Sequence, residues 1–287
     1  MKAIPGYTIV KNSLGQDLYV QTKVWDNVNK LLDAGVPVFL YGPKGTSKTE
    51  TAEALAISRG FTKAAGTFFQ GEFGSVTSGD QLDGYVTMNP TTKTLEMIPS
   101  ELLKAVRVAG SGVSAFMSAD ELNRVAVPSA LNKLLRLLAQ GEYATDLEGV
   151  LQVRGNLEFV ATANIGYRGT TKLNEALMDR FDAFEMSPIG GDALAQVLQA
   201  RYPSVGIKDI GKIVKFVDQN RRAAQKDDYE GVEVSTRDAL RIARGISIGM
   251  TGMEAVETLV GGQVAIAQGG RAALQALVTE AKGQFAA

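Results

Sequence analysis

Five short apolar segments, separated by stretches with helical periodicity, most constrain what this chain can fold into. Near-continuous apolar runs are expected of parallel strands that helices cover on both faces. The pattern therefore predicts an α/β fold with a five-stranded parallel sheet and helices on both faces. The segments are residues 36–42 (VPVFLYG), 67–73 (TFFQGEF), 112–119 (GVSAFMSA), 157–164 (LEFVATAN) and 182–188 (DAFEMSP).

Helical patterns lie between and after these segments. Residues 49–60 predict a helix that Gly60 ends, and residues 128–141 predict one with Leu131, Leu134, Leu135 and Leu138 on one face. After about residue 190 only helical patterns follow, with the doublet Gly261-Gly262 expected to interrupt them. We therefore expect two domains, an α/β core over residues 1–189 and a small all-α domain over residues 190–287.

Composition narrows the chemistry. The 287 residues include no Cys and no His, which excludes thiolate chemistry and the commonest proton shuttle and zinc ligand. Catalysis would have to use carboxylates, Lys, Arg, hydroxyls and a hard cation such as magnesium, a set that suits phosphoryl transfer. The net charge of −1 gives no global attraction to nucleic acid. No secretory signal or apolar run of about 20 residues is seen, so we expect a cytoplasmic protein without a membrane span.

The stretch GPKGTSKT (Gly42–Thr49) follows the first apolar segment and opens a helical one. It matches the phosphate-binding P-loop G-x-x-x-x-G-K-[ST], except that Ser47 stands where a glycine belongs. Loop N–H groups would cradle phosphates, Lys48 would reach the β- and γ-phosphates, and Thr49 would ligate magnesium. A serine is tolerated at this position if its φ is negative and is costly if φ is positive. The alternative is a Gly-rich turn. The predicted binding residues are Gly42, Pro43, Lys44, Gly45, Thr46, Ser47, Lys48 and Thr49.

Polar residues end two later strands. Asp120 and Glu121 follow an apolar strand, as in a Walker B element, so that Asp120 would hold magnesium through water and Glu121 would polarise the attacking water. Asn164 ends the next strand, where an amide can orient that water or contact the γ-phosphate. Solvated loop charges and a turn residue are the alternatives. Arg180 and Arg237 follow, and an isolated arginine is by default a surface charge.

Together these elements resemble the AAA+ ATPases, and most closely the MoxR-like branch, which includes CbbQ/NorQ-type and dynein-related proteins. The resemblance extends from about Val36 to Arg244. Its branch-specific parts are DELNR (Asp120–Arg124), EALMDRFD (Glu175–Asp182) and STR (Ser235–Arg237). It implies ATP and Mg²⁺ as cofactors, with Lys48 and Thr49 in Walker A and Asp120 and Glu121 in Walker B.

The resemblance also implies roles for isolated residues. Asn164 would be sensor 1, Arg237 would be the sensor 2 arginine of the lid domain, and Arg180 would be an arginine finger acting on the neighbouring subunit's nucleotide. Arg124 receives no role from the resemblance, and a salt bridge at the subunit interface is the default expectation for it.

An assembly and a task follow from the same resemblance. The chain is expected to form a ring, taken as a hexamer, that remodels a partner protein or complex, typically one with a von Willebrand A-type domain. Residues 82–110 and 142–159 look like the two hairpin inserts of this branch and would face the central pore.

Two other functions remain open. A nucleic-acid motor of restriction type would need basic, aromatic-rich pore loops. The first insert offers one lysine, Lys93, within residues 88–97, and the second offers Arg154. A structural ring that binds ATP without turnover would not need Glu121.

Overall fold

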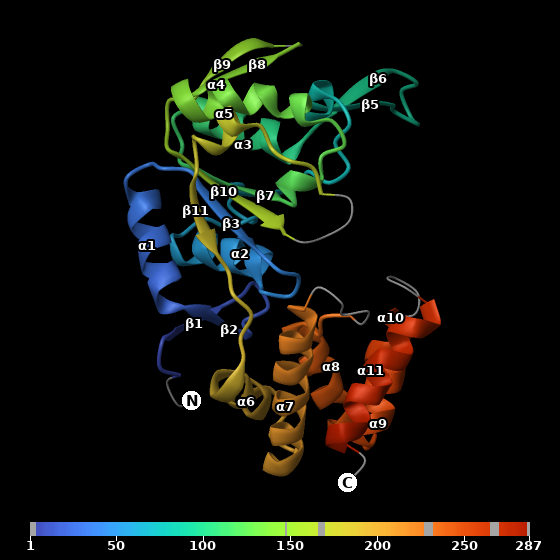
Figure 1. The fold of residues 1–287 in the computed structure, drawn as a ribbon. Coiled ribbons are helices and arrows are strands. Elements are labelled where there is room, and N and C mark those ends of the chain that lie inside the picture. The colour runs from blue at the N-terminus through green and yellow to red at the C-terminus, as the bar shows by residue number, and fades with distance from the viewer. Residues whose placement is uncertain (1–3, 147, 166–169, 227–231, 265–269, 286–287) are drawn as a thin grey trace. The chain divides into compact units, whose positions relative to one another are not determined.

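The computed structural model describes residues 4–146, 148–165, 170–226, 232–264 and 270–285. The chain divides into two compact units, one made of residues 6–186 and the other of residues 187–287 together with residues 1–5 (Figure 1). Among the described residues, no helix combines the length and the apolar character needed to cross a membrane.

The unit of residues 6–186 is built on a five-stranded parallel sheet with the strand order β11-β3-β10-β7-β4 (Figure 1). All five predicted strands are present, and the predicted parallel sheet is confirmed. The strands are β3 (Val38–Gly42), β4 (Phe68–Glu72), β7 (Ala115–Asp120), β10 (Leu157–Asn164) and β11 (Asp182–Glu185).

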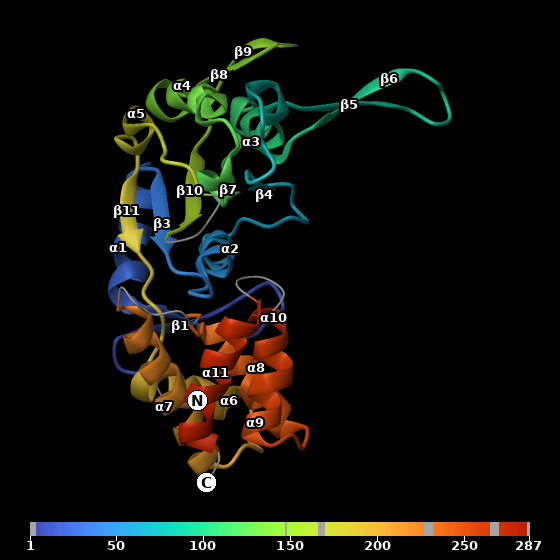
Figure 2. The ribbon, with the colours of Figure 1, turned by 45° about the vertical axis from the view of Figure 1, so that its right-hand side comes forward.

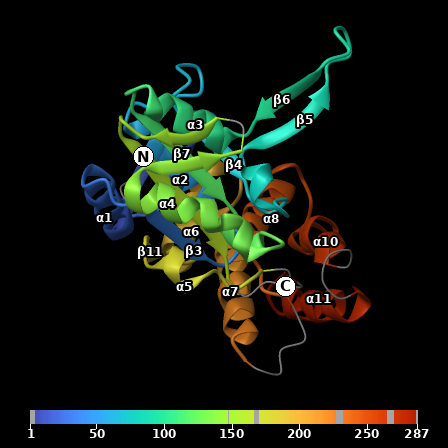
Figure 3. The same ribbon diagram turned by 90° about the horizontal axis from the view of Figure 1, so that it is seen from above.

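Helices cover both faces of this sheet, which is why the strands read as continuous apolar runs. Phe116 of β7 packs in one core cluster with residues of α1 (Thr22–Asp33) and α2 (Lys48–Ser58). Its neighbour Met117 packs in a second cluster with residues of α3 (Glu101–Gly110) and α4 (Asn132–Gln140). Figure 1 shows the sheet between α3 and α4 on one side and α2 on the other, and Figure 3 gives the view from the side of α3 and α4.

The four leucines predicted to share one face all belong to or pack against the same core cluster. Leu131 and Leu134 are buried as expected, but the next buried residue is Leu137, while Leu135 and Leu138 are only partly buried. A 3₁₀ turn over Pro128–Leu131 precedes the helix, and Leu131, Leu134 and Leu137 are the buried leucines of this stretch.

The described part of the unit of residues 6–186 also contains three antiparallel hairpins. The first pairs β1 (Tyr7–Lys11) with β2 (Asp17–Gln21) ahead of α1 and was not predicted. The other two lie in the expected inserts. One pairs β5 (Gly84–Met88) with β6 (Leu95–Pro99) and projects as a long arm in Figure 2, and the other pairs β8 (Glu142–Thr145) with β9 (Gly149–Gln152).

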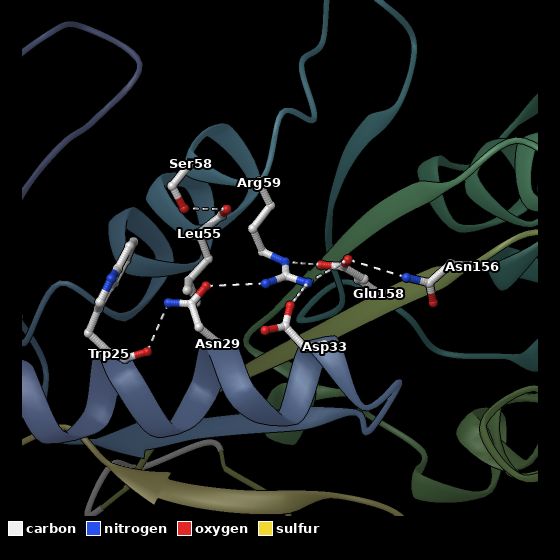
Figure 4. A network of polar contacts seen from close by, with 8 residues as sticks. All are labelled: Trp25, Asn29, Asp33, Leu55, Ser58, Arg59, Asn156 and Glu158. Atoms are coloured by element: carbon white, nitrogen blue, oxygen red, sulfur yellow. Dashed lines mark hydrogen bonds and ion pairs between the residues drawn. The ribbon is translucent and has the colours of Figure 1, made fainter.

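A buried ion pair fixes the C-terminal end of α2 (Figure 4). The guanidinium of Arg59 contacts both carboxylate oxygens of Glu158 on β10, at 2.5 and 2.9 Å. It also reaches Asp33 and Asn29 of α1. The hydrogen bond to Glu158 raises the pKa of Arg59. Two helices and a central strand are thus joined through one side chain.

The second unit is helical. Its elements are α6 (Gly191–Arg201), α7 (Ile207–Ala224), α8 (Thr236–Ser247), α9 (Gly252–Ala255), α10 (Gly262–Val264) and α11 (Gly270–Phe285). The expected break at Gly261-Gly262 is wrong, because a π-helical turn over Val256–Gly261 joins α9 to α10. A Cβ on Gly261 would lie 2.5 Å from a methyl carbon of Leu274 on α11. This glycine therefore permits helix packing rather than ending a helix.

Candidate active site

The loop Gly42–Thr49 leaves the end of β3 and opens α2 at Lys48. Two of its glycines have positive φ, +153° at Gly42 and +79° at Gly45. A Cβ on Gly42 would lie 2.4 Å from the carbonyl oxygen of Met186, which follows β11. Only glycine therefore fits this position.

Ser47 adopts the left-handed conformation, with φ of +59° and ψ of +31°. This is the costly alternative of the two considered for a serine here, because left-handed backbone brings Cβ close to the carbonyl oxygen in L-residues. Residue 47 therefore has the backbone conformation that favours glycine, although it is a serine.

The Lys48 side chain folds back onto its own loop. Its Nζ donates to the carbonyl oxygens of Gly42 at 3.0 Å and Pro43 at 2.7 Å, and to Thr46 Oγ1 at 3.2 Å. The residue is only 7% exposed, whereas Lys44 is exposed. Three oxygen atoms of the loop thus accept from this buried cation, and phosphate oxygens could take their place.

Asp120, the last residue of β7, is 8% exposed. Its Oδ2 accepts from Gln70 Nε2 at 2.8 Å and its Oδ1 from Thr162 Oγ1 at 3.2 Å. Burial raises the pKa of Asp120, against the opposing effect of hydrogen bonds from side chains that include the Thr49 hydroxyl. The structure therefore brings together the two residues predicted to hold magnesium. Among the described residues there is no group of three or more acidic, His or Cys side chains placed to hold a metal.

Glu121 also has a left-handed backbone, with φ of +55°. Its Oε1 accepts from Asn164 Nδ2 at 2.9 Å, and its Oε2 accepts from Arg124 Nη1 at 2.6 Å. Its backbone N–H donates to Thr162 Oγ1 at 3.2 Å. Walker B and the strand-end amide are therefore directly connected.

Strand order explains this convergence. β10 lies between β3 and β7, and its residue Asn164 is in register with Gly42 of β3. Because all three strands are parallel, their carboxyl ends meet at one edge of the sheet, where ligands commonly bind in open α/β sheets. The P-loop, the two acids and the amide all follow or end these strands.

Asn123 forms further hydrogen bonds at the carboxyl edge of the sheet. The Asn123 Nδ2 donates to the backbone carbonyl of Asn164 at 2.7 Å. The backbone carbonyl of Asn123 accepts from the backbone N–H of Thr171 at 2.7 Å. Its side-chain oxygen is buried and has no hydrogen-bond partner among the described residues.

Arg180 lies at the other edge of the sheet. It follows α5 (Glu175–Met178) and precedes Asp182, which is in register with Val38 at the start of β3. Its Nε donates to the carbonyl of Leu135 at 3.0 Å, and Nη1 donates to the carbonyl of Ala176. The structure therefore does not bring Arg180 to the P-loop of its own chain.

Arg237 belongs to the helical unit. It is exposed on the first turn of α8, which begins with a capping box between Ser235 and Asp238. The P-loop and Walker B residues belong to the other unit.

Sequence analysis did not identify Gln70, Thr162 or Asn123 as site residues. It also did not predict the contact between Arg124 and Glu121. A signal was available for two of them. Gln70 and Thr162 interrupt apolar strands with a polar side chain, and Thr162 shares a strand face with Asn164 two residues later.

Comparisons with known proteins agree with this geometry. A family model described as "AAA domain (dynein-related subfamily)" matches residues 37–181. The uncharacterized protein YojN of Bacillus subtilis (strain 168) is 30% identical over 195 residues, which cover 65% of this chain and 58% of that protein. An uncharacterized protein of Staphylococcus aureus (strain USA300) is 25% identical over 231 residues, covering 78% of this chain and 83% of that protein.

A solved structure shares the fold. The crystal structure of NtrX from Brucella abortus in complex with ADP aligns with a TM-score of 0.51 and 13% identity. The alignment covers 79% of this chain and 49% of that one. The chain thus spans little more than half of YojN and about half of NtrX.

Proposed function

The chain belongs to the dynein-related subfamily of AAA-domain proteins, and we propose that it binds ATP with Mg²⁺ and hydrolyses it. One observation carries this proposal. A buried lysine, a carboxylate beside a hydroxyl, and a second carboxylate paired with an amide converge at one edge of the parallel sheet. These groups meet the needs of phosphoryl transfer, which relies on positioning and charge stabilisation.

Nucleotide binding would use the loop before α2. Residues 44–47 would offer backbone N–H groups at the N-terminus of that helix, where anions are favoured. Lys48 would exchange the carbonyls of Gly42 and Pro43 for phosphate oxygens, a stronger charge-assisted contact. The ADP bound by NtrX, which shares the fold, supports a nucleotide in the same class of site.

The donor set at Asp120 fits magnesium. Mg²⁺ prefers oxygen ligands and is typically bound by one or two carboxylates plus phosphates and waters. The Thr49 hydroxyl beside the Asp120 carboxylate supplies that set. When bound, the ion would neutralise the charge that develops on the transferred phosphoryl group. Asp120 would hold it, and Gln70 and Thr162 would hold Asp120.

Hydrolysis would depend on Glu121. Its carboxylate can accept a proton from a water molecule positioned for in-line attack, and general-base catalysis typically contributes about 10²–10⁴ in rate. Asn164 donates to the same carboxylate at 2.9 Å and would hold it or orient the water.

Arg180 supports a shared site. Because it lies at the sheet edge opposite the P-loop, we propose that it serves the nucleotide of a neighbouring subunit as an arginine finger. Such an arrangement needs a head-to-tail assembly, and we propose a ring, taken as a hexamer from the family.

Arg237 would act from a lid. We propose that residues 1–189 form the nucleotide-binding core and residues 190–287 the lid, with Arg237 as the sensor 2 arginine reaching the γ-phosphate. Its exposed place on α8 leaves its guanidinium accessible to a ligand.

We propose that ATP turnover remodels a partner protein, in the manner of the MoxR-like branch, with a von Willebrand A-type protein as the expected partner. The two insert hairpins would face the pore of the ring. The β5–β6 arm supports a protein client over nucleic acid, because Tyr85, Val86, Met88 and Leu95 are exposed on it. Lys93 is its one basic residue, and single-stranded nucleic acid binding needs a positively charged groove.

An ATPase assay across protein concentration tests the proposal. Specific activity should rise with concentration, Glu121→Gln should lower kcat by about 10²–10⁴, and Arg180→Ala should lower it by about 10³ or more. Arg136→Ala, which removes an exposed arginine from α4, should have no effect. A flat concentration dependence with a fully active Arg180→Ala would reject the shared site.

Filter binding tests the nucleic-acid alternative. A motor acting on DNA should bind it at micromolar protein, with an affinity that falls steeply as salt rises. We expect no such binding.

A further inference from the structure

Arg124 contacts the carboxylate on which hydrolysis depends. Its Nη1 donates to Glu121 Oε2 at 2.6 Å, while Asn164 Nδ2 donates to Oε1 at 2.9 Å. Each oxygen of Glu121 therefore has its own donor, one from the Walker B turn and one from β10. Two donors from different directions fix the plane of a carboxylate, whereas a single donor lets it rotate.

The backbone between Glu121 and Arg124 is built for this contact. Glu121 has φ of +55° and ψ of +42°, a conformation that persists in a non-glycine residue only where its surroundings fix it. The Arg124 N–H donates to the Glu121 carbonyl at 2.9 Å, closing a tight turn. Asn123 ties the same turn to the carbonyl of Asn164.

A third segment lies against the pair. A Cβ on Gly74, after β4, would be 3.4 Å from the Arg124 Cβ and 3.5 Å from Glu121 Oε2. A side chain at position 74 would therefore contact both side chains, and glycine leaves that space open.

The pair is half-exposed, with 48% of the Arg124 side chain and 26% of the Glu121 side chain accessible. Exposed ion pairs between neighbouring helical positions contribute little to stability. The contact is therefore better suited to orienting a side chain than to holding the fold.

We propose that Arg124 is a positioning residue that orients the Glu121 carboxylate of its own chain for the attacking water. This inference rests on the proposed ATPase function. It replaces the expectation that Arg124 forms a salt bridge at a subunit interface, since its partner lies three residues away in the same chain.

Steady-state kinetics test the role. Arg124→Ala should lower kcat by roughly 10- to 100-fold, because a misplaced general base loses most of its effect. The KM for ATP and the melting temperature should stay at their wild-type values. Arg124→Lys, which keeps the charge, should restore part of kcat.

Arg136→Ala is the matched control. Arg136 pairs with Glu142 at 2.7 Å, with 59% and 27% of the two side chains exposed, and lies on α4 away from the Walker B turn. It should leave kcat unchanged. Wild-type kcat for Arg124→Ala would overturn the inference, as would a loss matched by a fall in melting temperature that Arg124→Lys does not reverse.

Mixing variants assigns the chain on which Arg124 acts. If it serves its own Glu121 while Arg180 serves a neighbour, mixing Arg124→Ala with Arg180→Ala should give more activity than the two measured separately. Mixing Arg124→Ala with Glu121→Gln should give no gain. The reverse pattern would place Arg124 across the interface and overturn the inference. A wild-type protein that hydrolyses no ATP at any concentration would instead overturn the proposed function.

Discussion

Ser47 and Glu121 share a backbone conformation that costs an L-residue roughly 1–2 kcal/mol. Among the described residues, the other non-glycine position with positive φ is Lys93, in the turn of the β5–β6 hairpin. Ser47 immediately precedes Lys48, and Glu121 immediately follows Asp120. Strained residues of this kind cluster where a side chain must be held in a functional geometry, and here they flank the lysine and the aspartate of the candidate site.

Replacement of Ser47 tests whether this strain is present. Ser47→Gly should stabilise the nucleotide-free protein by up to about 1 kcal/mol, because relief of the left-handed strain exceeds the added entropy of the unfolded chain. Ser47→Ala keeps the strain and should give no gain. Urea denaturation of both variants measures the difference.

Equal stability of the glycine and alanine variants would mean that residue 47 has no strained φ. The same variants belong in the ATPase assay. A large gain in turnover for Ser47→Gly alone would show that serine restrains the native loop.

At the scale of elements, Asp83 joins the two insert hairpins. It lies just before β5 and is 3% exposed. Its Oδ1 accepts from Tyr143 Oη of β8 at 2.8 Å, and its Oδ2 pairs with Lys133 Nζ of α4 at 2.9 Å. Burial and the Asp83 charge raise the pKa of Tyr143. The bases of two hairpins, separated in sequence by α3, β7 and α4, are thus held by one carboxylate.

Removal of this carboxylate should be costly. Asp83→Ala leaves the Tyr143 hydroxyl without its acceptor and Lys133 with only the more distant Asp146, at 3.6 Å, and should destabilise the protein by about 2–4 kcal/mol. Tyr143→Phe removes one hydrogen bond to a charged group and should cost about 1–3 kcal/mol. Urea denaturation provides both values.

Lys172→Ala is the control, since it removes a pair with Glu175 in which both side chains are largely exposed. It should leave the free energy of unfolding unchanged. If Asp83→Ala behaves like this control, the hydrogen bonds at Asp83 do not hold the hairpin bases together.

The elements also show what sequence can and cannot predict. The five parallel strands were predictable because their burial on both faces leaves continuous apolar runs, and the acids and the amide were predictable because they stand at strand ends. The break at Gly261 was wrong because a glycine needed for close packing against Leu274 resembles one that ends a helix. The contacts of Gln70 and Arg124 were not predictable, since they depend on which strands are neighbours and on the turn after Asp120.

At the scale of the whole molecule, the proposed arginine finger would leave the candidate site incomplete within one chain. The P-loop and Glu121 lie at the carboxyl edge of the sheet, and Arg180 lies at its amino edge. Two inactive variants should therefore complement each other. A mixture of Glu121→Gln and Arg180→Ala should regain activity, because about a quarter of the interfaces in a random head-to-tail assembly combine an intact Glu121 with an intact Arg180.

ATPase activity of the mixture, compared with each variant alone, measures this. Mixing Glu121→Gln with Lys48→Ala should give no recovery, since both changes affect the same side of the interface. Activity no greater than the sum of the separate variants in the first mixture would argue for a site completed within one chain.

Arg237 lies in the helical unit, whereas the P-loop lies in the other unit. Arg237→Ala should lower kcat by about 10-fold or more through loss of a contact to the γ-phosphate, since one donor to developing charge is typically worth that much. Arg244→Ala, on the same helix α8, is a control for loss of charge. Equal activity of the two variants would remove Arg237 from the proposed site.

The placement of Arg180 and the P-loop at opposite sheet edges gives the proposed assembly a direction. Every subunit would give an arginine at one end and receive one at the other, so a row of subunits with free ends always contains one nucleotide that no arginine serves. Only closure removes that deficit. Joining the last subunit to the first would therefore complete one more site without adding a subunit, and a short open fragment of the assembly would work below its share.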